Sequence, residues 1–190
     1  MLEDLKKINE LLSIEDKNIL YEAVFKKEDI FKVFKELKNN ELFKFNQLID
    51  ITAVDYPSRK NRFEIIYILL SMKKNKRIIL KTSIGEDENI DSITRIFKAS
   101  DWYERECYDL FGIKFNNHPD LRRIMTDYNF EGHPLRKDFP LTGHTEVRYD
   151  DVEKKVVYEP VKLTQEYRDF DYTSPWEGIP KGIDDHNDQE

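Results

Sequence analysis

The stretch from Glu104 to His144 constrains the fold of this chain more than any other part of the sequence. It is rich in charged and aromatic residues, prolines and histidines, and its apolar residues follow neither a helical nor a strand period. A backbone without regular hydrogen bonding must find partners for its N–H and C=O groups elsewhere, so such a run is either disordered or laid against a surface. The aromatic residues argue against disorder. The sequence therefore predicts an ordered, irregular segment that needs a surface beneath it.

Glycine, proline and charge divide the chain near residue 100. Of six glycines and seven prolines, only Gly85 and Pro57 lie in the first hundred residues. These hundred residues hold 19 Lys and Arg against 17 Asp and Glu, a net charge of +2, whereas the remainder holds 12 against 21, a net charge of −9. The two parts therefore have different structural roles.

Hydrophobic periodicity predicts the elements of the first part. Apolar residues recur at helical spacing in residues 2–12, 30–37 and 90–97. Runs rich in apolar and aromatic residues predict strands over 18–25, 48–55, 63–72 and 77–84. Two short polar turns join the last three strands, which favours an antiparallel meander. This order of elements indicates an α+β domain with helices packed on one face of an antiparallel or mixed sheet.

A further short helix is expected to begin at Asp101, which would act as a capping residue with Glu104 three positions later, and to end at Gly112. On a helical wheel, one face of this helix is apolar and is expected to pack. That face holds Trp102, Tyr103, Cys107, Leu110 and Phe111.

Charged residues occupy the rest of this helix. Arg105, Glu106 and Asp109 fall on or beside the side opposite the apolar face. Glu106 and Asp109 are like-charged neighbours one turn apart, which costs free energy unless a cation lies between them. We expect Arg105, or Arg122 or Arg123 further along the chain, to provide that cation.

Beyond Gly112, prolines interrupt every candidate helix, and only residues 145–149 and 156–160 look extended. We therefore expect an α+β domain over 1–112, followed by an extended arm over 113–178 that wraps a partner. Residues 179–190 are predicted to form a disordered acidic tail.

Composition excludes several classes of function. No apolar run approaches the roughly 18–20 residues of a membrane-spanning helix. The net charge of −7 disfavours binding to duplex nucleic acid, which depends on neutralising phosphates. Cys107 is the only cysteine, too few for an internal disulfide or for an iron–sulfur cluster held by four thiolates. The chain has no glycine-rich phosphate loop, and its start has no targeting pattern.

Catalytic interpretations of the charged region are weak. A metal site could use Cys107, His118, His133 and His144, but their successive gaps of 11, 15 and 11 residues contain no short ligand spacing. A nucleophilic Cys107 would sit on the face expected to be buried, where thiols are usually inert. Glu104, Glu106 and Asp109 could transfer protons, yet nothing indicates a substrate pocket around them. A free-standing metal-dependent enzyme that uses the three histidines remains the alternative of a different class.

The same region carries a family signature. Glu104-Arg105-Glu106, Asp109-Leu110-Phe111, His118, Arg122, Ile124 and Met125 resemble, position by position, the C-subunit family of respiratory complex I, also called the thirty-kilodalton subunit of NADH:quinone oxidoreductase. The likeness continues through 132–140, Gly143-His144, 146–150, Phe170 and 174–176, and spans about Asp101 to Gly178. The first hundred residues match only in layout.

The resemblance implies a noncatalytic core subunit of the peripheral arm of proton-translocating NADH:ubiquinone oxidoreductase. Its domain and arm would scaffold the neighbouring large subunit, which is related to nickel–iron hydrogenases, near the quinone-reducing end. This chain would carry no cofactor or metal, with FMN and iron–sulfur clusters held by partner subunits. A subunit of a related plastoquinone-type or hydrogenase-type complex is the alternative within the same resemblance.

Residues that match the family signature are expected to pin the arm to the domain and to the partner, with no catalytic role. They are Glu104, Arg105, Glu106, Asp109, His118, Arg122, Arg123, His133, Arg136, Lys137, Asp138, His144 and Trp176. The lack of a leader fits a bacterial or an organelle-encoded product, and the Lys-, Asn- and Ile-rich first half suggests an AT-rich coding genome. We expect the matrix side of the mitochondrial inner membrane, with the cytoplasmic side of a bacterial plasma membrane as the alternative.

Overall fold

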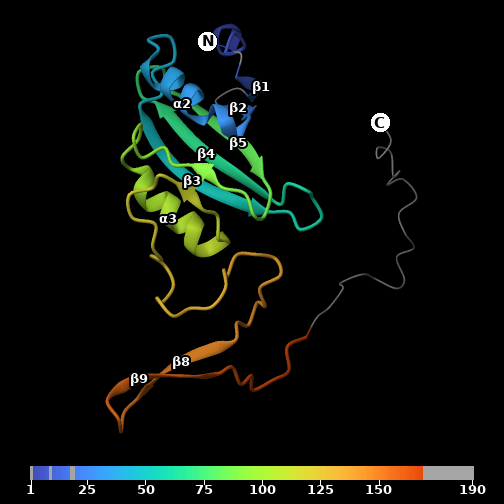
Figure 1. Cartoon of the computed structure of the whole chain (residues 1–190), viewed down its shortest axis with the longest axis vertical. Helices are drawn as coiled ribbons and strands as arrows, with labels where there is room; N and C mark the ends of the chain where they lie inside the picture. The colour runs from blue at the N-terminus through green and yellow to red at the C-terminus, as the bar shows by residue number, and fades with distance from the viewer. Residues whose placement is uncertain (1, 9, 18–19, 169–190) are drawn as a thin grey trace, which may run out of the picture. The chain divides into compact units, whose positions relative to one another are not determined.

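The computed structural model of the chain describes residues 2–8, 10–17 and 20–168 and divides into two units, which meet between Gly143 and His144 (Figure 1). The helices are α1 (Leu2–Leu5), α2 (Ile30–Asn39) and α3 (Ser100–Phe111), with a 3-10 turn η1 (Lys27–Asp29) before α2. The strands are β1 (Leu11–Lys17), β2 (Leu20–Phe25), β3 (Gln47–Asp55), β4 (Phe63–Ser71), β5 (Lys76–Ile84), β6 (Ile90–Asp91), β7 (Phe115–Asn116), β8 (Thr145–Asp150) and β9 (Lys155–Pro160).

A five-stranded mixed sheet forms the centre of the first unit. Its strand order is β1-β2-β5-β4-β3, with β2 and β5 parallel and all other neighbours antiparallel. The meander of β3, β4 and β5 follows the prediction, because short polar turns connect strands whose side chains alternate between the two faces, apart from a register shift between Leu48 and Asp50 in β3. Side chains of β4 alternate between buried and half-buried along its whole length. The sheet therefore has one packed face and one more open face.

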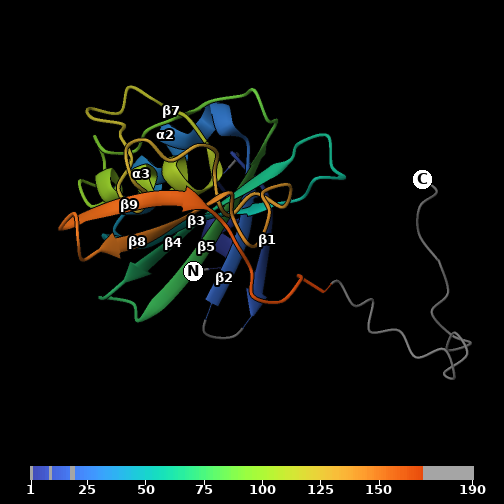
Figure 2. The ribbon, with the colours of Figure 1, turned by 90° about the horizontal axis from the view of Figure 1, so that it is seen from below.

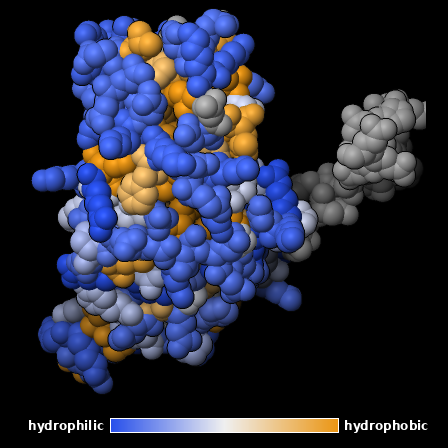
Figure 3. All heavy atoms as spheres, turned by 45° about the horizontal axis from the view of Figure 1, so that its top comes forward, coloured by the Kyte–Doolittle hydropathy of each residue, from blue (hydrophilic) through white to orange (hydrophobic). Residues whose placement is uncertain are grey.

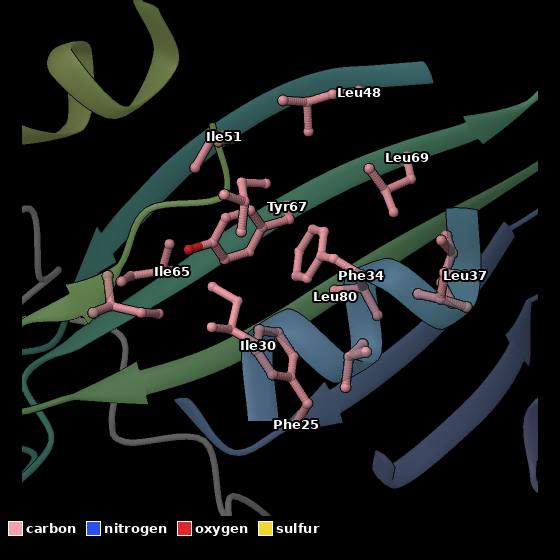
Figure 4. Close-up of a cluster of buried hydrophobic side chains, with 14 of the residues drawn as sticks. Phe25, Ile30, Phe34, Leu37, Leu48, Ile51, Ile65, Tyr67, Leu69 and Leu80 are labelled. Atoms are coloured by element: carbon pink, nitrogen blue, oxygen red, sulfur yellow. The ribbon is translucent and has the colours of Figure 1, made fainter. Parts of the chain in front are cut away.

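Helices α2 and α3 lie on the packed face of the sheet (Figure 2). The amphipathic stripe predicted over 30–37 forms α2, whose Ile30, Val33, Phe34 and Leu37 are buried. Phe34 meets Tyr67 of β4 edge to face, with ring centroids 4.9 Å apart. Figure 4 shows these rings among the aliphatic side chains of β3, β4 and β5. The α+β class, with helices on one sheet face, is confirmed.

Two predicted helices are wrong. Among the described residues of the range 2–12, only those of the short α1 are helical, and Leu11 instead begins β1, which pairs with β2. Over residues 90–97, Ile90–Asp91 form β6, which pairs with β7 and leads into a single turn closed by bonds to the Ile93 carbonyl. Both segments bury one side, so their apolar residues recur at a spacing that resembles a helix. Pairing with a neighbouring strand nevertheless satisfies their backbone N–H and C=O groups in place of a helix.

The segment over residues 113–143, called here the irregular segment, belongs to the first unit. This segment packs on α3 and the sheet, so the first compact unit extends past Gly112 to Gly143, while the partner-wrapping arm over 113–178 stays a prediction. The second unit contains the hairpin of β8 and β9, which matches the two extended runs predicted there. The predicted tail at 179–190 lies outside the described residues.

The face of the molecule drawn in Figure 3 is largely hydrophilic, with apolar residues between the hydrophilic ones. Within the described ranges, no helix has the length and apolar character that a membrane span requires.

Candidate functional site

Helix α3 buries charged residues that the helical wheel placed on its solvent side. Asp109 is 0% and Arg105 9% exposed, whereas Trp102, expected to pack, is 64% exposed. Cys107 and Phe111 are buried as predicted. The difference arises because the irregular segment covers the charged side of α3 and supplies partners for its charges, which a wheel drawn for one helix cannot include.

Asp109 is the centre of this contact. Its Oδ2 accepts the backbone N–H groups of Ile124, Met125 and Thr126 at 3.0, 2.7 and 2.8 Å. Its Oδ1 accepts Nη1 of Arg123 at 2.7 Å and the Thr126 hydroxyl at 2.5 Å. Burial alone would raise the pKa of the Asp109 carboxyl, but these hydrogen bonds outweigh it and hold that pKa well below its usual range. One carboxylate therefore fixes a whole turn of the irregular segment.

Two arginines extend this attachment. Arg123 also donates to the Gly132 carbonyl at 3.0 Å. Arg105 donates from Nε to the Arg122 carbonyl at 3.1 Å and from Nη2 to the Arg123 carbonyl at 3.3 Å. Of the cations proposed to neutralise Asp109, Arg123 does so. Arg105 binds backbone carbonyls instead, and Arg122 pairs at 2.8 Å with Asp120, where both side chains are exposed.

The irregular segment also caps the C-terminal end of α3. The last carbonyls of a helix have no partner within it. Here the Asp109 carbonyl lies 2.9 Å from Nδ1 of His133, the Leu110 carbonyl accepts the Leu135 N–H at 3.0 Å, and the Phe111 carbonyl accepts Nε of Arg136 at 2.6 Å. A cation at this end also favours the helix dipole. The helix ends at Gly112 as predicted, and this residue has a left-handed conformation with φ of 79°.

A second cluster ties the irregular segment to the sheet. Asp55, at the end of β3, has a fully buried side chain that binds Arg62 through two bonds of 2.8 and 2.9 Å. Asp55 also accepts the Lys137 N–H at 2.8 Å, and Arg62 pairs with Asp138 at 3.0 Å. Hydrogen bonding to Arg62 lowers the pKa of the Asp55 carboxyl.

The sequence predicts Arg136, Lys137 and Asp138 as site residues but does not identify their partners. Glu86 is one of these, since it pairs with both Arg136 and Arg62, at 2.9 and 3.1 Å. Asp55 and Arg62 are the others. A usable signal existed for Asp55, because it continues the inward-facing alternation of Ile51 and Ala53 in β3.

His118 lies at the other end of α3. Its Nε2 is 3.1 Å from the Asp101 carbonyl oxygen, and its Nδ1 accepts the Asp120 N–H at 3.1 Å. The capping box expected between Asp101 and Glu104 is wrong. Ala99 occupies the N-cap position without a side-chain hydrogen bond, and Glu104 instead accepts the Ile93 N–H at 2.8 Å. The tertiary contact with the turn at Ile93 draws Glu104 inward.

The structure does not gather the candidate metal ligands. His118 contacts residue 101 and His133 contacts residue 109, positions about 12 Å apart along the helix axis. Cys107 is buried with its Sγ 3.4 Å from the Ile51 carbonyl oxygen, and burial raises the pKa of its thiol well above its usual range. Within residues 2–8, 10–17 and 20–168, no three His, Cys, Asp or Glu side chains are placed to hold a metal.

Glu106, His144 and Trp176 are the remaining predicted site residues. Glu106 is half-buried on α3. His144 begins the second unit, where its carbonyl oxygen accepts the Val161 N–H at 3.3 Å. Trp176 and the other signature positions after residue 168 lie outside the described residues.

The fold is that of an α+β domain also present in a solved respiratory membrane complex. A chain in the structure of the membrane-bound sulfane sulfur reductase (MBS), an archaeal respiratory membrane complex, superposes with a TM-score of 0.64. The match covers 73% of this chain and 82% of that chain at 23% identity, which shows a shared fold.

The family follows from sequence. The profile of the respiratory-chain NADH dehydrogenase 30 Kd subunit matches residues 23–145, and the chain belongs to this family. It is 52% identical over 162 residues to the NADH-quinone oxidoreductase C-subunit of Rhodospirillum rubrum, covering 85% of this chain and 76% of that protein. The C-subunit of Ruegeria pomeroyi is 60% identical over 142 residues, covering 75% and 71%. The family resemblance inferred from the signature is confirmed.

Proposed function

We propose that this chain is a noncatalytic core subunit of the peripheral arm of proton-translocating NADH:ubiquinone oxidoreductase, where it scaffolds the hydrogenase-like large subunit near the quinone-reducing end. Its homologues are C-subunits of NADH-quinone oxidoreductase, and the family is that of a respiratory-chain subunit. The scaffold role rests on one feature of the second unit, the hairpin of β8 and β9.

One face of this hairpin is apolar and exposed. The register places Val147 opposite Tyr158 and Tyr149 opposite Val156, so these four side chains share a face. They are 52–60% exposed. The opposite face is charged, with Arg148 paired to Glu159 at 3.0 Å. A two-stranded hairpin is marginally stable in water by itself, so this apolar face calls for a covering surface from another polypeptide.

The irregular segment presents further apolar groups outward. Its exposed large side chains are Met125, Tyr128, Leu135 and Leu141. Methionine and tyrosine are enriched where proteins meet. The polar side of the same segment is held on α3 and the sheet through Asp109 and Asp55. We infer that the contacts of Asp109 and Asp55, called here the internal clamps, hold the segment in one conformation. They thereby orient its outer side chains toward the neighbouring subunits.

The polar groups of the site are engaged in structural contacts rather than free for chemistry. Asp109, Arg105, Arg123 and Arg136 each bind backbone groups of another segment. Cys107, the only thiol, is buried. We therefore propose that the chain binds no metal or cofactor itself, and that FMN and the iron–sulfur clusters belong to partner subunits. Stoichiometric zinc or iron that stays on the purified chain after chelation would contradict this.

Photo-crosslinking in native membranes tests the scaffold role. A photoreactive phenylalanine analogue at Val147 or Tyr158 should crosslink to the hydrogenase-like large subunit, identified by mass spectrometry. The matched control is Val157, which neighbours Tyr158 in β9 and lies opposite Arg148, on the charged face of the hairpin. Crosslinks confined to this chain itself, or equal yields from Val157, would overturn the proposal.

The subunits that co-purify with the chain would identify the membrane and the electron donor. We propose attachment to the matrix side of the mitochondrial inner membrane. The alternative is the cytoplasmic side of a bacterial plasma membrane, and the bacterial origin of the relatives named above supports this alternative. Subunits that co-purify with the chain from fractionated membranes decide between these locations. The same mass spectrum separates an NADH-oxidising complex from a plastoquinone-type or hydrogenase-type one.

A further inference from the structure

Strand β4 is apolar on both of its faces. Its inward side chains are fully buried in the core that α2 covers (Figure 4). Three residues that alternate with them point to the open face of the sheet and are half-buried, namely Ile66, Ile68 and Leu70. An antiparallel strand with one face in water usually alternates apolar with polar residues. Apolar residues on both faces are instead typical of a strand that is covered on both.

The neighbouring strand widens this apolar surface. Ile79 of β5 lies opposite Ile68 in the register, so it points to the same side and is also half-buried. Helices α2 and α3 both lie on the other face of the sheet (Figure 2), and α1 borders α2, with which it lines a cavity. We call the four aliphatic residues of the open face the outer stripe, which consists of Ile66, Ile68, Leu70 and Ile79.

A cluster of cations lies at one end of the outer stripe, where β4 turns into β5. Arg77 lies opposite Leu70 in the register, and Lys74 is in the turn itself. Both side chains are exposed, and neither forms an ion pair with the residues that the structure describes. We call this cluster the basic tip, which consists of Lys73, Lys74, Lys76 and Arg77.

Elsewhere along the outer stripe, the charges are largely paired. Two carboxylates of the open face form ion pairs, Glu22 with Lys17 and Lys81, and Glu64 with Arg59. Asp50 of β3 lies opposite Ile68 and adds one carboxylate beside the middle of the stripe. At the basic tip, Glu41 pairs with Lys73 at 3.5 Å, which leaves an excess of positive charge there. The open face is therefore apolar along its middle and positive at one end.

We propose that the outer stripe and the basic tip together form a docking surface for an amphipathic helix of another polypeptide. The apolar side of this helix covers the stripe, and acidic residues at one of its ends meet the basic tip. Ile66 and Leu70 are about 13 Å apart along the strand. This length corresponds to about two and a half turns of an α-helix. Apolar residues at helical spacing over that length can therefore contact the whole stripe.

Two observations favour this occupant over a second copy of the chain. On its inner side, β4 is already covered by the amphipathic α2, and helices are the common cover of a sheet face in α+β domains. A second copy would bring together two chains that each have a net charge of −7 and repel each other. The residues of this surface differ from those of the hairpin and the irregular segment, so the inference does not depend on the scaffold contact proposed above.

Photo-crosslinking from the outer stripe in native membranes identifies the occupant. A photoreactive phenylalanine analogue at Ile68 should crosslink to another subunit, within a segment whose apolar residues recur at helical spacing and which is acidic at one end. The matched control is Lys35, an exposed residue of α2. Crosslinks to this chain, to a second copy, to lipid or to a segment without that pattern would overturn the proposal. A yield no higher than from Lys35 would do the same.

A charge exchange tests the role of the basic tip. A synthetic peptide of the crosslinked segment should bind the purified full chain, and Lys74→Glu with Arg77→Glu should weaken this binding by at least about tenfold. Replacing the acidic residues of the peptide with lysine should restore its binding to that variant. The matched control, Lys35→Glu with Lys114→Glu, changes the net charge equally and should bind the acidic peptide like the native chain. Equal binding of both peptides to both variants would refute the proposed complementarity.

A substitution in the outer stripe separates this contact from the scaffold contact. Ile68→Thr keeps a β-branched residue in the strand but removes apolar surface, so both peptides should bind more weakly. In complexes that contain this variant, the crosslink from Val147 to the large subunit should persist while the helix-bearing subunit is lost on washing with salt. Full retention of that subunit would contradict docking on the stripe, whereas loss of the Val147 crosslink alone would count against the scaffold contact.

Discussion

Asp109 of α3 and Arg123 of the irregular segment form an ion pair of 2.7 Å in which the aspartate side chain is completely buried. Taking charges out of water is costly, and the pair is tolerated because Asp109 also accepts three backbone N–H groups and the Thr126 hydroxyl. Such a pair specifies one arrangement of two segments more dependably than it adds stability. The clamp therefore sets where the irregular segment lies on α3.

Replacing Asp109 by Asn should destabilise the first unit strongly. The substitution leaves Arg123 without its counter-ion and removes an acceptor from a run of backbone N–H groups. Breaking a buried pair from one side costs about 3–5 kcal/mol. The matched control is Asp120→Asn, which breaks the exposed pair with Arg122 and should cost much less. Denaturant unfolding of the full chain measures both. Equal losses in the two variants would refute a central role for Asp109.

Acid should weaken the native chain through Asp109. Because hydrogen bonds hold the pKa of this carboxyl below its ordinary value of 3.8, its contribution is present above that value and disappears as pH falls beneath it. The free energy of unfolding should therefore drop between about pH 5 and about pH 2. Asp109→Asn should show a shallower drop over the same range. An unchanged slope in the variant would mean that another carboxyl governs acid unfolding.

Gly112→Ala should disrupt the contact at the C-terminal end of α3. The residue has φ of 79°, and an added Cβ would come within 2.5 Å of Arg136 Nη2 and 2.6 Å of His133 Cδ2. The left-handed conformation alone costs about 1–2 kcal/mol for a side-chain-bearing residue. Gly85→Ala is the control, since its Cβ would meet Glu88 at an ordinary 3.4 Å. Thermal unfolding should show a clear loss for Gly112→Ala alone.

Tyr149→Asp should lower the amount of assembled complex without unfolding the first unit. The change places a charge on the apolar face of the hairpin, where burial against a partner would cost free energy. We expect association to weaken by at least about tenfold. Val157→Asp, placed by register on the charged face, should assemble nearly normally. Native gels of solubilised membranes provide the readout, and normal assembly of Tyr149→Asp would contradict a covered hairpin face.

Cys107→Ser should leave electron transfer per assembled complex almost unchanged. Serine can also donate to the Ile51 carbonyl that lies 3.4 Å from the native sulfur, so a modest loss of stability is the expected cost. NADH oxidation normalised to the amount of complex measures the effect. A large fall in this ratio would restore a chemical role for the thiol.

The elements that could be predicted are those whose local pattern agrees with their final environment. The strand of Phe63–Ser71 alternates strictly and is buried on one face, and the stripe of Ile30–Asn39 becomes a packed helix. Residues 90–97 were misassigned because one-sided burial in a strand and turn produces the same spacing as a helix. The partner that decides this case is Phe115–Asn116, which lies far along the chain.

By itself, the sequence determined the α+β class, the meander, the membership of the family and the need for a surface beneath residues 104–144. Only the tertiary structure decided which charges are buried. Asp109 and Arg105 lie beneath the irregular segment, while Asp55 reaches it from the sheet. Periodicity reports the preference of one element for an apolar side. The burial of a charge depends instead on hydrogen-bond donors that arrive from distant segments once the chain has folded.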